Sequence, residues 1–231
     1  VDHRGESLPV HTRLNGVHWV HAILAAIATG LALGLPLAEA VEAVGTVQPW
    51  EARLSELEVD GVTFLRDDGK APLWTVEAAV EVLRRARAPR RVAVFGTISD
   101  YHGRASSVYA GVARRALDAA DEVIFVGPQA RRAEGARSHP RGAALRCFES
   151  IAAAAEHLGR TLRPGDVVLL KGSNRADHLL RLALARGGQI GCWRGECRRL
   201  KFCDACLLRR VPVLPHLRLP GPAVRSAPLD A

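Results

Sequence analysis

The sequence predicts an α/β protein whose central sheet is doubly wound and mostly parallel, and three observations lead to this prediction. Short apolar runs such as Val62 to Leu65 and Val92 to Phe95 have the length of buried strands. Segments with apolar residues at helical spacing lie between these runs. The runs end abruptly in small and polar residues, which is typical of the ligand-carrying loops at the carboxyl ends of parallel strands.

The first 47 residues predict two helices. Between His18 and Leu33 the apolar residues repeat at helical spacing, and Gly34 ends that helix. Pro36 stands in the favoured first-turn position of a second helix that runs to Val44. We therefore expect three units in the chain: residues 1–47, a larger domain over 48–188, and a tail over 189–231.

Residues 61–103 form the stretch around which the larger domain is organised. A strand from Val62, a helix over 75–87 with Thr75 as its N-cap, and a second strand from Val92 make a βαβ unit. Charged and hydroxyl residues follow both strands, at 66–70 and at 97–100. Because the carboxyl ends of parallel strands lie at one edge of a sheet, we expect the chemistry there.

The rest of the domain continues the alternation of strands and helices. Strands are predicted at 122–126, 143–148 and 166–170, and helices at 107–120, 150–158 and 174–186, with a loop or weak helix at 131–141.

Composition and charge narrow the class of protein. Of 231 residues, 48% are hydrophobic and 24% are charged, which is ordinary for a globular protein. No apolar run reaches the roughly 18 residues of a membrane helix, and no leader resembles a signal peptide, so we expect a cytoplasmic protein. The net charge of +8 suits nucleic acid, acidic lipid or phosphorylated substrates. A solvated arginine-rich surface explains the clusters before residue 140 more simply.

Four cysteines gather in the tail, at positions 192, 197, 203 and 206, with four, five and two residues between them. Short spacings let thiolates converge on one tetrahedral metal ion, so Cys192, Cys197, Cys203 and Cys206 predict a zinc site that staples a small cap. Iron–sulfur ligation uses the same four sulfurs and stays open, whereas two disulfides are less typical of a cytosolic protein. Trp193 and several arginines leave nucleic-acid binding as a further use of the tail.

Several segments, in chain order over about residues 8–186, resemble the Mur ligase family of ATP-dependent amide ligases that make peptidoglycan precursors. A Gly-x-His pattern precedes an alanine-rich helix, an Arg-Leu pair enters the larger domain, and a Lys-Gly-Ser turn follows a late strand. The segments that carry the resemblance are Gly16–His18, Ala52–Leu54, Asp67–Ala71, Phe95–Asp100 and Gly165–Ser173. The resemblance implies that residues 1–47 end an ATPase domain and that residues 48–188 form a Rossmann-like C-terminal domain.

The resemblance also implies roles on the nucleotide side. His18 would lie against the base and Arg53 would reach the phosphates of ATP, which binds with Mg²⁺. Asp68 would hold the ribose or the interdomain hinge, and Lys70 would lie near the transferring phosphoryl group. Trp19 stands where the family has Asn, and this departure bears on the adenine contacts.

On the acceptor side, the resemblance implies that Asp100, Lys171 and Ser173 face an incoming amine, carried by an amino acid or a peptide. The family activates a carboxylate donor as an acyl phosphate, and the amine then displaces phosphate.

The family's phosphate-binding Gly-Lys-Thr or Gly-Lys-Ser loop does not occur in the sequence, which begins with Val1 and contains no methionine. We therefore expect the C-terminal half of a ligase, inactive alone, with the ATPase half in the same or another chain. The alternative is an inactive, metal-stapled basic module that binds nucleic acid or a partner protein.

Overall fold

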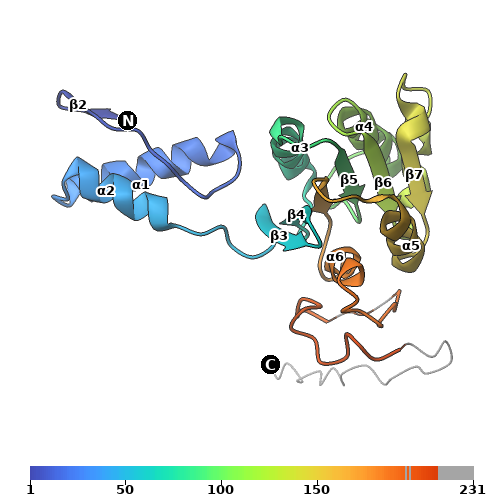
Figure 1. Cartoon of the computed structure of the whole chain (residues 1–231). Coiled ribbons are helices and arrows are strands. Elements are labelled where there is room, and N and C mark those ends of the chain that lie inside the picture. Colours follow the sequence, from blue (N-terminus) through green and yellow to red (C-terminus); the bar gives the residue numbers. More distant parts are fainter. Residues whose placement is uncertain (196, 198, 213–231) are drawn as a thin grey trace, which may run out of the picture.

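The computed structural model describes residues 1–195, 197 and 199–212. Its first part is a small helical unit that lies to one side of a larger sheet domain (Figure 1). A hairpin of β1 (Asp2–His3) and β2 (Glu6–Ser7) precedes the 3-10 helix η1 (Val17–Trp19) and the two predicted helices, α1 (Val20–Ala32) and α2 (Leu37–Thr46).

The helical unit has a small core of its own. Ile27 of α1 packs with Leu37, Ala40 and Val44 of α2, and all four side chains are buried. An extended stretch after α2 leads into the larger domain, as the passage from blue to cyan shows (Figure 1).

The sheet of the larger domain has six strands in the order β3-β4-β8-β5-β6-β7. Every pair is parallel except β3 with β4, so the predicted mostly parallel sheet is confirmed. The strands are β3 (Ser55–Val59), β4 (Val62–Asp67), β5 (Arg91–Phe95), β6 (Glu122–Val126), β7 (Leu145–Phe148) and β8 (Val167–Lys171).

Helices cover both faces of this sheet. One core joins α3 and α4 to the first face, and another joins α5 and α6 to the second, which is the predicted doubly wound arrangement. The helices are α3 (Val76–Arg85), α4 (Ala105–Leu117), α5 (Ile151–Thr161) and α6 (Leu180–Arg186), with 3-10 helices η2 (Leu73–Thr75), η3 (Ala130–Ala136) and η4 (Gly142–Ala144).

Strand β8 lies between β4 and β5, so the βαβ unit predicted over residues 61–103 does not consist of neighbouring strands. Residues 168–170 are fully buried because the sheet covers them on both sides and helices cover both faces. From β5 the chain proceeds through β6 and β7 toward one edge, whereas β8 and β4 lie toward the other. The switch point, where such folds open a crevice for ligands, is therefore between β5 and β8.

Helix α6 begins at Leu180, six residues after the predicted start at Asn174. The carboxylate of Asp177 accepts hydrogen bonds from residues outside the helix, and His178 has a left-handed backbone with φ 51°. These two features keep the segment before Leu180 as a turn. Within the described part of the chain, no helix is long and apolar enough to cross a membrane.

Candidate functional site

Loops from the carboxyl ends of β4, β5 and β8 are joined to one another by backbone hydrogen bonds. The Ser99 amide donates to the Ala71 carbonyl at 2.8 Å, which joins the β5 loop to the β4 loop. The Gly96 amide donates to the Lys171 carbonyl at 2.9 Å, which joins β5 to β8. The predicted site segments therefore form one continuous edge of the sheet.

Asp177, which was not among the predicted site residues, organises this edge. Its carboxylate accepts hydrogen bonds from the Thr97 amide and hydroxyl and from the Ser173 amide, each at 2.7 Å. Gly96 and Gly172 lie directly against the same carboxylate, where a Cβ at either position would collide with it. An aspartate four residues after the Lys-Gly-Ser turn was the only local signal of this role.

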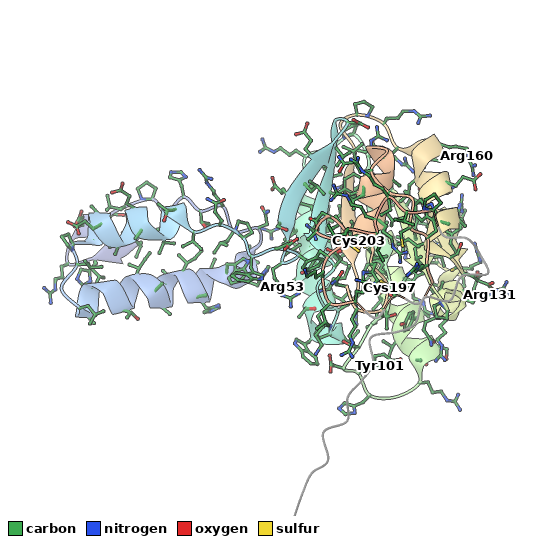
Figure 2. The ribbon with its side chains drawn as sticks, turned by 90° about the horizontal axis from the view of Figure 1, so that it is seen from below. Arg53, Tyr101, Arg131, Arg160, Cys197 and Cys203 are labelled. Atoms are coloured by element: carbon green, nitrogen blue, oxygen red, sulfur yellow. The ribbon has the colours of Figure 1, made fainter. Side chains whose placement is uncertain are left out.

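His18, Arg53 and Asp67 line one cavity of about 250 Å³, which lies where the helical unit meets the sheet domain. Arg53 lies on the side of the sheet domain that faces α1 and α2 (Figure 2). Burial lowers the pKa of His18, whereas the nearby Asp67 carboxylate raises it. The structure thus brings together two residues, His18 and Arg53, that are 35 positions apart in the sequence.

Gly69 allows the guanidinium of Arg53 to approach the β4 loop. A Cβ at position 69 would lie 2.5 Å from Nη1 of Arg53. The same Nη1 donates to the carbonyl of Ala52 at 3.2 Å. Among the described residues, no ion pair involves Arg53, so its remaining donors can reach a ligand.

Asp67 and Lys171 form a buried ion pair across β4 and β8. The Lys171 ammonium donates to Oδ2 of Asp67 at 2.5 Å, and Lys171 is only 1% exposed. Burial raises the pKa of Asp67 and lowers that of Lys171, while the attraction between the two opposes both changes. Lys171 therefore holds the Asp67 carboxylate, and the ammonium group of Lys171 is not exposed to an acceptor substrate.

Asp68 points into the protein, away from the cavity. It is 0% exposed, and Nε of Arg66 lies 3.5 Å from its Oδ1. Burial raises the pKa of Asp68 to about 6, although Arg66 opposes this change. Successive side chains of an extended chain alternate in direction, so Asp67 and not Asp68 reaches the cavity, and this alternation was the signal that could have selected it.

Lys70 and Asp100 lie on the rim of the same edge. Nζ of Lys70 is 3.2 Å from Oδ2 of Asp100, and their side chains are 58% and 38% exposed. The Ser99 hydroxyl and Lys70 both stabilise the carboxylate and lower the pKa of Asp100. These two predicted site residues are accessible to a ligand.

The described part of the tail docks on this edge. The guanidinium of Arg66 lies 5.0 Å from the centre of the Phe202 ring and 3.7 Å from a carboxylate oxygen of Asp204. Nδ2 of Asn174 donates to the carbonyl of Leu200 at 2.8 Å. A cap on the sheet domain was predicted, and these contacts show what this segment packs against.

The predicted zinc site is not confirmed. Cys192, Cys197, Cys203 and Cys206 are all free thiols, and no group of three His, Cys, Asp or Glu side chains among the described residues is placed to hold a metal ion. Residues 196, 198 and 213–231 of the predicted tail lie outside the described residues.

A larger cavity, of about 670 Å³, lies away from the predicted site residues. Asn15 and Val17 line it on one side, and Thr63, Val82 and Val167 line it on the other. Thr63 and Val167 stand at the beginnings of β4 and β8, so this cavity lies toward the amino ends of the parallel strands. Glu56, Glu81 and Arg85 also line the larger cavity, but only the smaller cavity lies at the carboxyl ends of the strands, where such folds bind ligands, and we place the candidate site there.

The doubly wound sheet, with charged side chains at the carboxyl ends of its parallel strands, is typical of α/β domains that bind ligands at that edge. Residues 52–174 match the family described as Mur ligase, glutamate ligase domain. The chain belongs to the Mur ligase family, of which it carries the C-terminal domain.

Individual relatives agree with this assignment. The chain is 30% identical over 179 residues to the UDP-N-acetylmuramoyl-tripeptide–D-alanyl-D-alanine ligase of Treponema pallidum (strain Nichols), a match that covers 74% of this chain and 39% of the relative. It also matches the structure of a UDP-N-acetylmuramoylalanyl-D-glutamyl-2,6-diaminopimelate–D-alanyl-D-alanyl ligase from Acinetobacter baumannii, with 26% identity and a TM-score of 0.63, over 74% of this chain and 36% of that one.

The fold alone is shared with the MurF ligase from Thermotoga maritima in complex with ADP. That match has 19% identity and a TM-score of 0.60, and it covers 75% of this chain and 39% of that one. The chain thus spans less than half the length of these relatives.

Proposed function

We propose that the chain is the C-terminal part of an ATP-dependent amide ligase that joins a carboxylate donor to the amine of an amino acid or a peptide. The observation that carries the proposal is the gathering of His18, Arg53 and Asp67 around one cavity at the carboxyl edge of the sheet. Membership of the Mur ligase family supports the reaction class. The expected compartment is the cytoplasm, where ATP is available.

In this proposal Arg53 supplies positive charge to the phosphates of ATP. Phosphoryl transfer to the donor carboxylate builds negative charge on the transferred group, and a guanidinium stabilises that charge through several donors at once. His18 lies at the other side of the same cavity and provides a ring against which the base packs.

Mg²⁺ would neutralise phosphate charge in this reaction, and Asp67 is the carboxylate that lines the cavity. Because Oδ2 of Asp67 already accepts a bond from Lys171, the described residues offer little for a metal ion. We therefore expect phosphate oxygens and the ATPase half of the ligase to hold most of the magnesium coordination.

Asp100 lies on the acceptor side of the proposed site, and Lys70, its ion-pair partner, acts near the transferring phosphoryl group. An amine substrate arrives as an ammonium ion, which the exposed Asp100 carboxylate can bind. After the ammonium has released a proton to solvent, the neutral amine attacks the acyl phosphate and phosphate leaves. Ser173 lies on the neighbouring loop, whose backbone Asp177 holds in place.

No specific observation favours the nucleic-acid alternative. Arg84 and Arg85 both pair with Glu81. Arg131 pairs with Glu149 at 2.8 Å. These contacts match the reading of the arginine clusters as solvated surface.

The test uses this chain together with the ATPase half, in one polypeptide or in two, supplied with ATP and with UDP-N-acetylmuramoyl-tripeptide and D-alanyl-D-alanine, the two substrates in the name of the Treponema relative. We expect phosphate release that requires all three substrates, and a fall of about 100-fold or more in Arg53→Ala, with a strong fall in Lys70→Ala. Arg160→Ala is the matched control, because Arg160 is exposed on α5 at a distance from Arg53 (Figure 2).

Wild-type turnover in Arg53→Ala and Lys70→Ala would refute the residue roles. If this chain and the ATPase half together release no phosphate with these or other Mur-type substrates, the proposed reaction is refuted.

A further inference from the structure

His178 is a buried histidine at the junction between the sheet domain and the tail. It lies between the β8 loop and α6, it is 1% exposed, and its backbone has the uncommon left-handed conformation, with φ 51°. Its Nδ1 is 3.6 Å from Sγ of Cys203. Its Nε2 is also buried and has no hydrogen-bond partner among the described residues. Of the two ring nitrogens, Nδ1 is therefore the one that faces the tail.

The pairing of a histidine ring with a cysteine thiol suits metal binding. Nδ1 of His178 lies beside Sγ of Cys203, and both side chains are buried. An imidazole nitrogen and a thiolate sulfur are the ligands that zinc and similar divalent ions prefer.

The four cysteines belong to the tail segment that packs at this junction. Cys203 is buried, and Cys192, Cys197 and Cys206 are half-buried. The Cys206 amide donates to the Cys203 carbonyl at 3.3 Å, which makes the tight turn of a two-cysteine half-site. All four are free thiols, so no disulfide competes for the sulfurs.

Backbone contacts hold this cluster against the domain. The Cys192 amide donates to the Arg209 carbonyl at 3.0 Å, which closes the tail segment into a loop. Arg181 of α6, buried beneath it, donates from Nη1 to the carbonyls of Cys192 at 3.2 Å and Arg194 at 2.8 Å. Nε of Arg181 also donates to the carbonyl of His178 at 3.4 Å, so Arg181 ties the cysteine-bearing segment to the turn that carries His178.

We propose that the tail and the sheet domain share one thiophilic divalent metal ion, of the zinc class, bound by His178 together with Cys203 and two further tail thiolates. The described side chains do not stand at coordinating distance from one another. Binding therefore requires the thiols to rotate inward, with each coordinating thiol releasing its proton to solvent as the metal–sulfur bond forms. The proposal is independent of the proposed ligase reaction, because it concerns only the attachment of the tail.

The site differs from a self-contained four-cysteine knuckle in a way that can be measured. A knuckle would bind metal through sulfur alone, whereas the shared site has three sulfurs and one nitrogen. Cadmium-113 NMR of the wild-type chain separates these ligand sets by chemical shift without any substitution. We expect one cadmium signal in the range of mixed sulfur and nitrogen coordination.

Substitutions then test each part of the cluster, with zinc affinity measured by chelator competition on the purified chain. His178→Asn removes the imidazole but keeps a residue that tolerates the left-handed backbone, and we expect its affinity for zinc to fall at least about tenfold. Cys203→Ser is expected to lose binding. Cys147→Ser is the matched control, because Cys147 lies on β7 and we expect one zinc per chain as in the wild type.

Three results would overturn the proposal. One is a wild-type chain that binds no zinc or cadmium. Another is a cadmium signal characteristic of four sulfurs, together with unchanged affinity in His178→Asn. The third is iron with labile sulfide in the purified chain, which would identify a cluster of another kind. Circular dichroism of each variant shows whether a loss of binding is accompanied by a loss of fold.

Discussion

The buried pair of Asp67 and Lys171 makes the sharpest prediction for stability. With 2.5 Å between Nζ and Oδ2, the attraction is about 7 kcal/mol at an effective dielectric constant near 20. The cost of taking both charges out of water offsets much of this attraction, but removing one partner leaves the other buried and uncompensated. We therefore expect Lys171→Met to lower the free energy of unfolding by about 3–5 kcal/mol at pH 7.

Two further variants show whether the effect comes from the lost partner. In Asp67→Asn/Lys171→Met no charge remains at the pair, so we expect recovery of about 2 kcal/mol or more relative to Lys171→Met. Lys70→Met removes a cation from the same edge, but its pair with Asp100 is exposed, so we expect a change below about 1 kcal/mol.

The measurement is urea denaturation of the chain followed by circular dichroism, with the midpoints compared at equal m-values. A Lys171→Met variant within about 1 kcal/mol of the wild type would refute the reasoning, because the lysine would then not be buried against a charged carboxylate.

Two other predictions concern buried carboxylates. The pKa of Asp68 is raised to about 6 in the folded state, whereas its unfolded-state pKa is near 3.8. Its contribution to the free energy of unfolding is therefore fully present below pH 3.8 and is lost as the pH rises through 6. Denaturation between pH 4 and 7 should show a fall of up to about 3 kcal/mol that is absent in Asp68→Asn, and equal slopes in both proteins would contradict the assigned burial. Asp177→Ala leaves the donors of Thr97 and Ser173 without an acceptor, so we expect the free energy of unfolding to fall by about 3 kcal/mol in the same assay. The control is Asp100→Ala at an exposed carboxylate, for which we expect a fall of less than about 1 kcal/mol. Similar losses in the two variants would contradict the role assigned to Asp177.

Local patterns in the sequence were sufficient to predict most elements of the sheet domain. The strand at 122–126 was predicted with its observed ends, because its apolar residues are bounded by polar residues and glycine. Strand β3 was not predicted, because glutamates alternate with its apolar residues at the edge of the sheet and leave no continuous apolar run. The place of β8 between β4 and β5 follows from long-range pairing, which no local pattern reveals.

The candidate site was predictable in its location but less so in its residues. Polar residues after the apolar runs indicated the correct edge of the sheet, and His18 and Arg53 do meet there. Whether Asp67 or Asp68 reaches the cavity depends on which face of the strand each side chain points to, and the two adjacent aspartates point in opposite directions. The role of Asp177 and the position of His178 beside Cys203 depend on contacts across the fold, to Thr97 and to the tail.

The contact of Gly96 and Gly172 with the Asp177 carboxylate constrains how this region can change during evolution. An alanine at Gly96 would place its methyl group on the carboxylate, and an alanine at Gly172 would meet both the carboxylate and Leu179. Either mutation therefore requires position 177 to become smaller first, and the one at Gly172 also requires Leu179 to move. A smaller residue at position 177, however, leaves the hydrogen-bond donors of Thr97 and Ser173 without an acceptor unless both loops change their backbone conformation. Descendants of this sequence should therefore inherit the three positions as a set, and lineages that lose the aspartate should be the ones in which the two glycines begin to vary.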